Sequence, residues 1–265
     1  MSDSYLLVPM QLDIMVLNVA ASVDTPFMRF QMDYTQLNLF NSPEPAPFSG
    51  ASLTQPAAGI YLHWTLPKPL RHGIYQDDGS TQFPLVPNRW LVVRVQNGVD
   101  AQSATKAWIV ESDYCSDTYA DPSGSNPSGG TSPYVDPKGP QKKDAVPPLS
   151  WIGRAYPFDS TLKGIPVQEN PFLRAVGPGN ISFASFSPGV QNVFAFYDDV
   201  TAADNSQIEK ATFSYYVVGW YSDPKHDPLA GSTWEADAEP SGKHKNSWSW
   251  TTGKSDFNSL AQMIP

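Results

Sequence analysis

Short runs in which apolar and polar residues alternate recur along the chain, whereas long runs with helical spacing do not. In the first run, every second residue from Leu6 to Val16 is apolar, which places these side chains on one face of a strand. Runs of this length predict an all-β fold, mainly an antiparallel β-sandwich. The runs expected to form strands are Tyr5–Val19, Pro26–Leu39, Gly59–Leu66, Arg89–Gln96, Lys106–Glu111, Asn180–Phe186, Asn192–Tyr197 and Thr212–Tyr221.

Two of these runs also indicate how the strands pack. In Gly59–Leu66, alternation places Trp64 on a continuous apolar face and His63 on the opposite face. The run Thr212–Tyr221 is apolar on both faces, so we expect a central strand that is covered on both sides.

Two long stretches have the composition of loops. Residues 112–148 are rich in Pro, Gly and Ser, and a loop of that length inside a compact domain is usually functional or mobile. Residues 222–265 combine Asp-Pro steps with a polar, acidic run. We therefore expect a β-sandwich domain over 1–221 that contains the long loop, followed by an extended C-terminal tail or linker over 222–265.

Composition narrows the class of protein. The 265 residues are 40% hydrophobic and 12% aromatic, which argues against intrinsic disorder. Lys and Arg number 17 against 26 Asp and Glu, so the formal net charge is −9. Because binding to nucleic acid depends on Lys and Arg that neutralise phosphates, we do not expect nucleic acid as a partner.

Cys115 is the only cysteine in the sequence, which excludes an intrachain disulfide and a cysteine-based zinc site. We expect it to be a small thiol that is buried or inert. The N-terminus carries no basic segment and Asp13 interrupts the first apolar run, so neither a signal peptide nor a membrane span is expected there. These features predict synthesis in the cytoplasm, with export by a signal-peptide-independent route as the alternative.

His63 and His72 are the candidates for metal binding. His72 lies in the turn after the strand that holds His63, so a hairpin would bring the two together. Asp77 or Asp78 would complete a set of two histidines and one carboxylate. On this hypothesis the cofactor is a divalent metal ion. The interpretation that we favour is that His63 is a hydrogen-bonded structural residue and that no cofactor is bound.

Asp198 and Asp199 form a second candidate ion site. Paired carboxylates occur in calcium sites and in acid–base catalysis. Adjacent residues on a strand point to opposite faces, however, so the two side chains act together only if the chain turns at this point.

A charged residue begins the run Arg89–Gln96. A buried Arg89 paired with a carboxylate would lock this corner of the fold, and Glu111 or Asp113, at the end of the next strand, are suitable partners. Alternatively, an arginine beside exposed aromatic residues would hold a ligand carboxylate or a sugar. We favour the structural interpretation.

The 8 Trp and 12 Tyr residues exceed the needs of one core. Trp248 and Trp250 stand among polar residues, and Tyr134 lies in the long loop. These three residues are the candidates for contact with a partner protein or with the face of a sugar ring.

Sequence patterns of other catalytic sites are absent. The chain has no Gly-x-Ser-x-Gly nucleophile elbow, and no glycine-rich loop between a strand and a helix to hold phosphate. We therefore assign no catalytic residue.

Four strings of the sequence carry a resemblance to a known group of proteins. They resemble, taken together, the N-terminal region of large, uncharacterised, mostly bacterial proteins. The resemblance implies that this chain is a fragment or a short stand-alone relative, since those proteins continue past this point. It implies no activity, cofactor or catalytic residue. The strings are Gly59-Ile-Tyr-Leu-His-Trp-Thr-Leu-Pro67, Phe83-Pro-Leu-Val-Pro-Asn-Arg-Trp90, Trp108-Ile-Val-Glu-Ser-Asp113 and Val218-Gly-Trp-Tyr-Ser-Asp-Pro224, the last extended by His226-Asp-Pro-Leu229.

The leading hypothesis for function is a non-enzymatic module for protein interaction or assembly, which forms the N-terminal part of a larger assembly or of a secreted cargo. Abundant aromatic residues and the missing catalytic patterns favour it, and its partners are other protein subunits or domains. The second hypothesis is a carbohydrate-binding module with Trp248, Trp250 and Tyr134 as an aromatic platform. The third is a metal-dependent enzyme built on His63 and His72.

Overall fold

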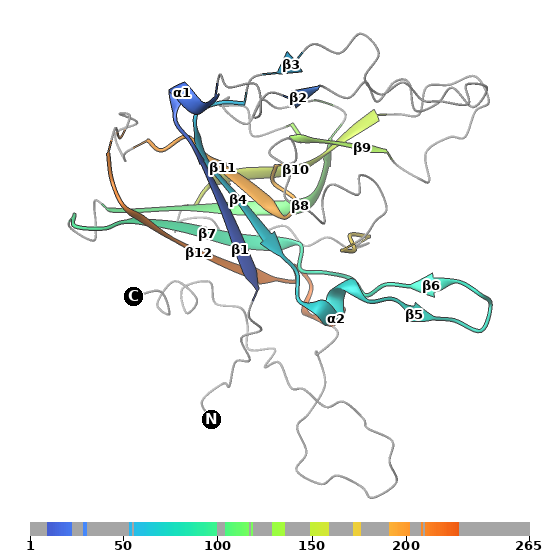
Figure 1. Ribbon diagram of the computed structural model, residues 1–265. Coiled ribbons are helices and arrows are strands. Elements are labelled where there is room, and N and C mark those ends of the chain that lie inside the picture. Colours follow the sequence, from blue (N-terminus) through green and yellow to red (C-terminus); the bar gives the residue numbers. More distant parts are fainter. Residues whose placement is uncertain are drawn as a thin grey trace, which may run out of the picture.

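Two antiparallel sheets, one of three strands and one of five, make up most of the fold (Figure 1). The computed structural model describes residues 10–22, 29–30, 53–54, 56–99, 104–116, 118, 129–135, 149–158, 172–175, 191–201, 208 and 210–227. Strands far outnumber helical turns in these residues, so the all-β class predicted from the sequence is confirmed.

The three-stranded sheet contains, in spatial order, β1 (Gln11–Leu17), β4 (Gly59–Thr65) and β11 (Ala195–Asp198). Both neighbours run antiparallel to β4, and Leu12 of β1 lies opposite Trp64 of β4. All three strands overlap runs in which alternation predicted strands.

The five-stranded sheet has the order β12-β7-β8-β10-β9, and every neighbouring pair is antiparallel. The register of β10 against β8 shifts between Ile152 and Arg154, where Gly153 has φ +80°. A Cβ on Gly153 would lie 2.3 Å from the carbonyl oxygen of Asn192, so this bulge requires glycine. The strands are β7 (Arg89–Gln96), β8 (Thr105–Ser116), β9 (Ser132–Val135), β10 (Leu149–Pro157) and β12 (Phe213–Trp220).

Aromatic side chains from both sheets fill the space between them. Trp64 of β4, Trp90 of β7 and Phe194, which precedes β11, are at most 1% exposed. The Trp64 and Trp90 ring centroids are 5.2 Å apart, and those of Trp90 and Phe194 are 6.2 Å apart. The Trp90 indole N–H donates to Ser112 Oγ at 2.8 Å, and Ser112 donates to the carbonyl of Val193. The two sheets therefore pack face to face, which confirms the predicted sandwich.

The outer face of the five-stranded sheet carries a second, smaller apolar cluster. Leu91, Val93 and Ile109 of this cluster are at most 4% exposed. Because β7 is buried on both faces, its sequence is a nearly continuous apolar run, as in strands that are covered on two sides.

Short elements flank the two sheets. Helices in the described residues have three or four residues, and none of them is long and apolar enough to cross a membrane. β2 pairs with β3, and β5 with β6, in separate two-stranded antiparallel sheets. The bounds are α1 (Val19–Ser22), β2 (Arg29–Phe30), β3 (Leu53–Thr54), α2 (Lys68–Arg71), β5 (Ile74–Tyr75), β6 (Thr81–Gln82) and the 3₁₀ helix η4 (Pro224–His226).

β12 does not have the central position that its sequence predicted. Among the described strands it is an edge strand that pairs with β7 alone, and most of its side chains are half-buried. Phe213 and Tyr215 pack against the core between the sheets, while Trp220 packs against the outer cluster. Side chains of β12 thus pack against the apolar clusters on both faces of the sheet, although the strand lies at its edge. This explains why the strand is apolar on both sides.

The long loop predicted over 112–148 also differs in detail. β8 continues through Ser116, and β9 lies inside the predicted loop. Cys115, in β8, is exposed, so the alternative of a buried thiol is wrong. The predicted strand Asn180–Phe186, most of Pro26–Leu39 and the tail beyond residue 227 lie outside the described residues.

Candidate functional site

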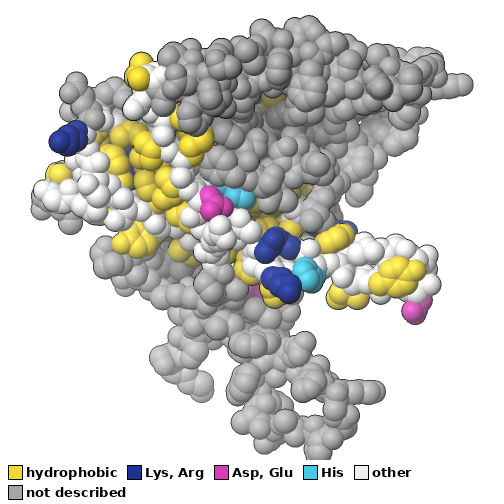
Figure 2. All heavy atoms as spheres, viewed as in Figure 1, with side chains coloured by type: hydrophobic (Ala, Val, Ile, Leu, Met, Phe, Trp, Pro, Cys, Tyr) yellow, Lys and Arg dark blue, Asp and Glu magenta, His cyan; other side chains and the backbone are white. Residues whose placement is uncertain are grey.

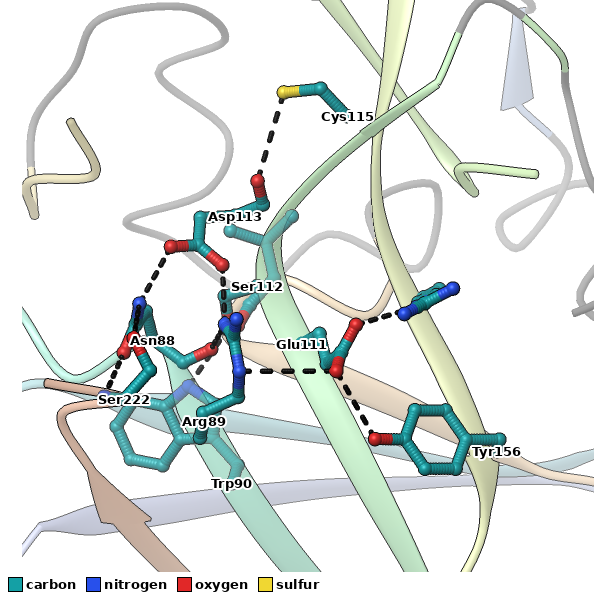
Figure 3. Close-up of polar contacts among 11 residues, drawn as sticks. Asn88, Arg89, Trp90, Glu111, Ser112, Asp113, Cys115, Tyr156 and Ser222 are labelled. Carbon is teal, nitrogen blue, oxygen red and sulfur yellow. Dashed lines mark hydrogen bonds and ion pairs between the residues drawn. The ribbon is translucent and has the colours of Figure 1, made fainter. Parts of the chain in front are cut away.

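A buried ion-pair network fixes the start of β7 to β8 (Figure 3). The Arg89 guanidinium pairs with the Asp113 carboxylate, and its Nε lies 3.9 Å from Glu111 Oε1. All three side chains are at most 4% exposed. The prediction that a buried Arg89 pairs with these carboxylates is therefore confirmed.

Asn88 extends the network to the chain that follows β12. Its side-chain amide donates to Asp113 Oδ2 at 2.6 Å and to Ser222 Oγ at 2.9 Å. The backbone N–H of Ser222 donates back to Asn88 Oδ1 at 2.8 Å. Residues that are 134 apart in sequence are thus joined at one corner of the sheet.

Glu111 is shared with β10. Arg154 Nε lies 2.5 Å from Glu111 Oε2, and the Tyr156 hydroxyl donates to Glu111 Oε1 at 3.1 Å. Burial, reinforced by the charge of Glu111, raises the pKa of Tyr156 to about 12. The Arg154 guanidinium also lies 3.8 Å from the ring centroid of Tyr114, in the geometry of a cation–π contact.

The network is electrically balanced, with Arg89 and Arg154 facing Glu111 and Asp113. Buried carboxylates that already accept hydrogen bonds from arginine, asparagine and tyrosine have little capacity left to bind a ligand. We therefore interpret the network as structural: it fixes the register of β7, β8 and β10.

A second buried ion pair lies between the two sheets. Arg94 Nη1 of β7 is 2.9 Å from both carboxylate oxygens of Asp198 in β11. The Tyr215 hydroxyl donates to Asp198 Oδ2 at 2.6 Å, and burial together with the Asp198 charge raises the pKa of Tyr215. The guanidinium lies 5.0 Å from the ring centroid of Phe213. Sequence reasoning missed this pair, because its members are 104 residues apart.

The two adjacent aspartates have separate partners. Asp198 is 1% exposed and belongs to the pair with Arg94. Asp199 is exposed, and it accepts hydrogen bonds from the Thr201 backbone N–H at 3.2 Å and from the Thr201 hydroxyl at 2.9 Å. Asp198 therefore joins the two sheets, whereas Asp199 closes a turn with Thr201. The two carboxylates do not form one site.

The histidines also occupy different environments. His63 is 3% exposed, and its Nδ1 lies 3.9 Å from Asp13 Oδ2 on the neighbouring strand β1. His72 follows α2 and is exposed, and Asp77 is exposed in the turn between β5 and β6. In the described part of the chain, no three His, Cys, Asp or Glu side chains lie close enough together to hold a metal ion.

The aromatic candidates are placed only in part. Trp248 and Trp250 lie outside the described residues. Tyr134 lies in β9, where its backbone is opposite Ser150 of β10.

The β5–β6 arm, which we define as residues 72–82, projects away from the sandwich (Figure 1). Two backbone hydrogen bonds close its turn: Gln76 N–H donates to Ser80 O at 2.8 Å, and Gly79 N–H donates to Gln76 O at 3.0 Å. Gly79 has φ +84°, a conformation that favours glycine. Hydrogen bonds from Ser80 lower the pKa of Asp78 and so keep this carboxylate charged.

Apolar side chains of the arm are exposed. Ile74 is 69% exposed and Tyr75 is 75% exposed. An isolated two-stranded hairpin is at best marginally stable in water. A defined hairpin that nevertheless presents large apolar side chains is typical of a surface that another molecule covers.

Charges of opposite sign lie at the two ends of the arm (Figure 2). Lys68 and Arg71 of α2 are exposed at its root, and Asp77 and Asp78 are exposed in the turn at its tip. Within the residues that the structure describes, none of these four side chains forms an ion pair.

A hollow of about 630 Å³ runs beside the arm. It is lined by the turn, including Asp77 and Asp78, and by Arg174 from the body of the protein. The backbone of Arg174 forms an isolated antiparallel β-bridge with Leu85. Arg174 is therefore a cationic group on the same side as the acidic tip.

Sequence reasoning did not select Ile74 and Tyr75 as site residues. The available signal was Asp78-Gly79, a dipeptide typical of hairpin turns. Each strand of the arm has only two residues, however, so no alternating run marks it.

No protein-family model matches this chain, and comparison with curated proteins and with solved structures found no match either. The geometry of the arm is therefore the basis on which a function is proposed.

Proposed function

We propose that this chain is a non-enzymatic module for protein interaction or assembly, and that the β5–β6 arm is its contact element. The observation that carries the proposal is the exposure of Ile74 and Tyr75 on a hairpin that projects from the sandwich. The module is one part of a larger assembly, with other protein subunits or domains as its partners.

A partner would supply the stability that the arm lacks by itself. Removing apolar surface from water contributes about 25 cal/mol per Å². A partner strand would also pair with the backbone groups at the edges of the hairpin. Tyr75 suits such a contact, because its ring is apolar while its hydroxyl still forms hydrogen bonds.

The sandwich does not depend on the arm for its core. It has an aromatic core and two buried ion-pair systems, and Ile74 and Tyr75 belong to neither apolar cluster. Substitutions in the arm should therefore change contacts with other molecules and leave the fold intact.

Cross-linking mass spectrometry tests the proposal, because Lys68 lies exposed at the root of the arm. In cells that produce the protein, we expect an amine-specific reagent to join Lys68 to a second protein chain. The double variant Ile74→Ser/Tyr75→Ser should lose these cross-links, since it removes the apolar surface of the arm.

Val99→Ser is the matched control. Val99 is another exposed apolar residue, at 46%, but it lies in the turn after β7. This variant should keep the cross-links at Lys68. Interchain cross-links that persist in the arm double variant would show that the arm is not the contact element, and their absence from the wild type would contradict the proposed function.

A further inference from the structure

The β5–β6 arm is complementary to itself. We propose that its partner is a second copy of this chain, and that β5 of one copy pairs antiparallel with β5 of the other about a two-fold axis beside Ile74. This inference rests on the proposed function and names the partner for the same arm.

The outer edge of β5 has the backbone groups that such pairing needs. Gln76 N–H donates to Ser80 O, so these two residues form a hydrogen-bonded pair of the hairpin. Hydrogen-bonded and non-hydrogen-bonded pairs alternate along an antiparallel ladder, and Tyr75 faces Thr81 in the next pair. Tyr75 therefore points its own N–H and C=O away from β6, and Gly73, two residues earlier, does the same.

A two-fold axis beside Ile74 would let the outward-pointing backbone groups of Gly73 and Tyr75 pair between the two copies. With Ile74 opposite its counterpart, Tyr75 of one copy lies opposite Gly73 of the other, and the two residues exchange both backbone hydrogen bonds. Because the axis relates the two copies, the same pair of residues forms twice in the dimer. The same antiparallel arrangement brings the tip of one arm, with Asp77, towards the root of the other, with Arg71.

The distribution of charge favours a second copy over an unrelated protein. The root of the arm is basic, with Lys68 and Arg71, and its tip is acidic, with Asp77 and Asp78. When two arms lie antiparallel, each acidic tip faces a basic root, so one arrangement forms two attractive contacts. This is the self-complementarity of an isologous dimer, in which the same patch serves both subunits.

Arg174 is another positive charge near the acidic tip, since it lines the hollow beside the arm. Within the described residues it forms no ion pair with Asp77 or Asp78. Arg174→Gln is therefore a matched control, because it removes a positive charge near the tip and leaves the root of the arm unchanged.

Charge reversal tests the dimer. Arg71→Glu sets an acidic group against Asp77 of the second copy, and Asp77→Arg sets a basic group against Arg71 of the second copy, so each variant alone makes this pair repulsive. In sedimentation velocity, each variant alone should have a dimer dissociation constant roughly tenfold above that of the wild type. An equimolar mixture of the two should restore association, because each variant then meets the opposite charge. Arg174→Gln should leave the constant unchanged.

Tyr75→Pro tests the pairing of β5 in a second way, because it removes the backbone N–H together with the exposed ring of Tyr75. Proline lacks the N–H that points away from β6, so the ladder inside the hairpin is retained and pairing at its outer edge is lost. We expect this variant to sediment as a monomer, with the near-ultraviolet circular dichroism of the folded protein unchanged.

A wild-type protein that sediments as a monomer at every concentration would overturn the self-pairing, as would a mixture of the two charge variants that fails to associate. If Lys68 is then still cross-linked to a different protein, the partner is wrong and the proposed function stands. If Lys68 gives no interchain cross-link at all, the proposed function fails as well.

Discussion

Glu111 is the residue on which the buried charges of the five-stranded sheet converge. It lies between Arg89 and Arg154 and accepts a hydrogen bond from Tyr156. Without this carboxylate, two guanidinium groups in a largely buried site lose a counter-charge. Such a loss costs much more than an exposed ion pair contributes.

We expect Glu111→Gln to lower the free energy of unfolding by about 3–5 kcal/mol, because glutamine keeps the shape of the side chain and removes its charge. Urea denaturation followed by tryptophan fluorescence measures this change. Asp77→Asn makes the same substitution at an exposed position and should shift the free energy by less than about 0.5 kcal/mol. Similar values for the two variants would contradict a stabilising role of the network.

Tyr156 should make stability depend on pH in the alkaline range. Burial, and then the charge of Glu111, raise its pKa to about 12 in the folded protein, against about 10 in an unfolded chain. The folded state holds this proton more tightly, so the stabilisation is present below about pH 10 and is lost as the pH rises through about 12. Urea denaturation at several pH values should show a smaller alkaline decrease for Tyr156→Phe than for the wild type. Parallel curves would rule out this contribution.

β12 depends on a glycine where it pairs with β7. Gly219 lies opposite Trp90, and a Cβ at this position would lie 2.1 Å from an atom of the Trp90 ring. The indole therefore covers the backbone of the neighbouring strand directly. The requirement for glycine here is steric, since the ring occupies the space of a side chain.

We expect Gly219→Ala to lower the free energy of unfolding by about 1–3 kcal/mol, because the Trp90 ring must move within a packed core. Chemical denaturation measures the loss. Ser214→Ala, on the same strand and half-buried, is the control and should change the free energy by less than about 0.5 kcal/mol. If the two variants are equally stable, the ring moves aside without cost.

The predictability of an element follows from its length and its neighbours. β4 and β7 were predicted with almost their full bounds, because each has seven or eight residues with a regular apolar pattern. β9 was not, since it is short and lies in a stretch rich in proline and glycine. β12 was predicted to be a central strand and is an edge strand among the described strands, because alternation reports which faces are covered and not how many strands pair with it.

At the scale of the whole molecule, the residues that the structure describes divide into a sandwich with its own core and an arm without one. Local stability follows the number of buried apolar contacts and protected hydrogen bonds. β7 and β8 meet both conditions, whereas the arm is exposed along almost its entire length.

Hydrogen–deuterium exchange should reveal this division. In dilute protein, we expect the amides of β7 and β8 to exchange most slowly and those of the arm to exchange fastest. Raising the protein concentration should slow exchange in the arm if a second copy covers it, while the exposed turn at residues 97–99 should be unaffected. Exchange from the arm that is slow in dilute protein would contradict the description of the arm as a hairpin without a core.

For the candidate sites, the sequence was informative where partners are close along the chain. Arg89 and its carboxylates were predicted because they lie at the ends of adjacent strands, 24 residues apart or less. Arg94 and Asp198 belong to different sheets, so only packing brings them together. The arm escaped prediction because exposure is a property of the surface, and the sequence around Ile74 and Tyr75 does not specify what covers them.

By itself, the sequence determined the class of this protein: alternation at period two decides which side chains are buried, and burial of apolar surface drives the strands into two packed sheets. Tertiary structure decided the rest. It set the order of the strands, paired charges from distant segments and left the β5–β6 arm outside the core. Those outcomes depend on contacts between residues far apart in the chain, where periodicity carries no information.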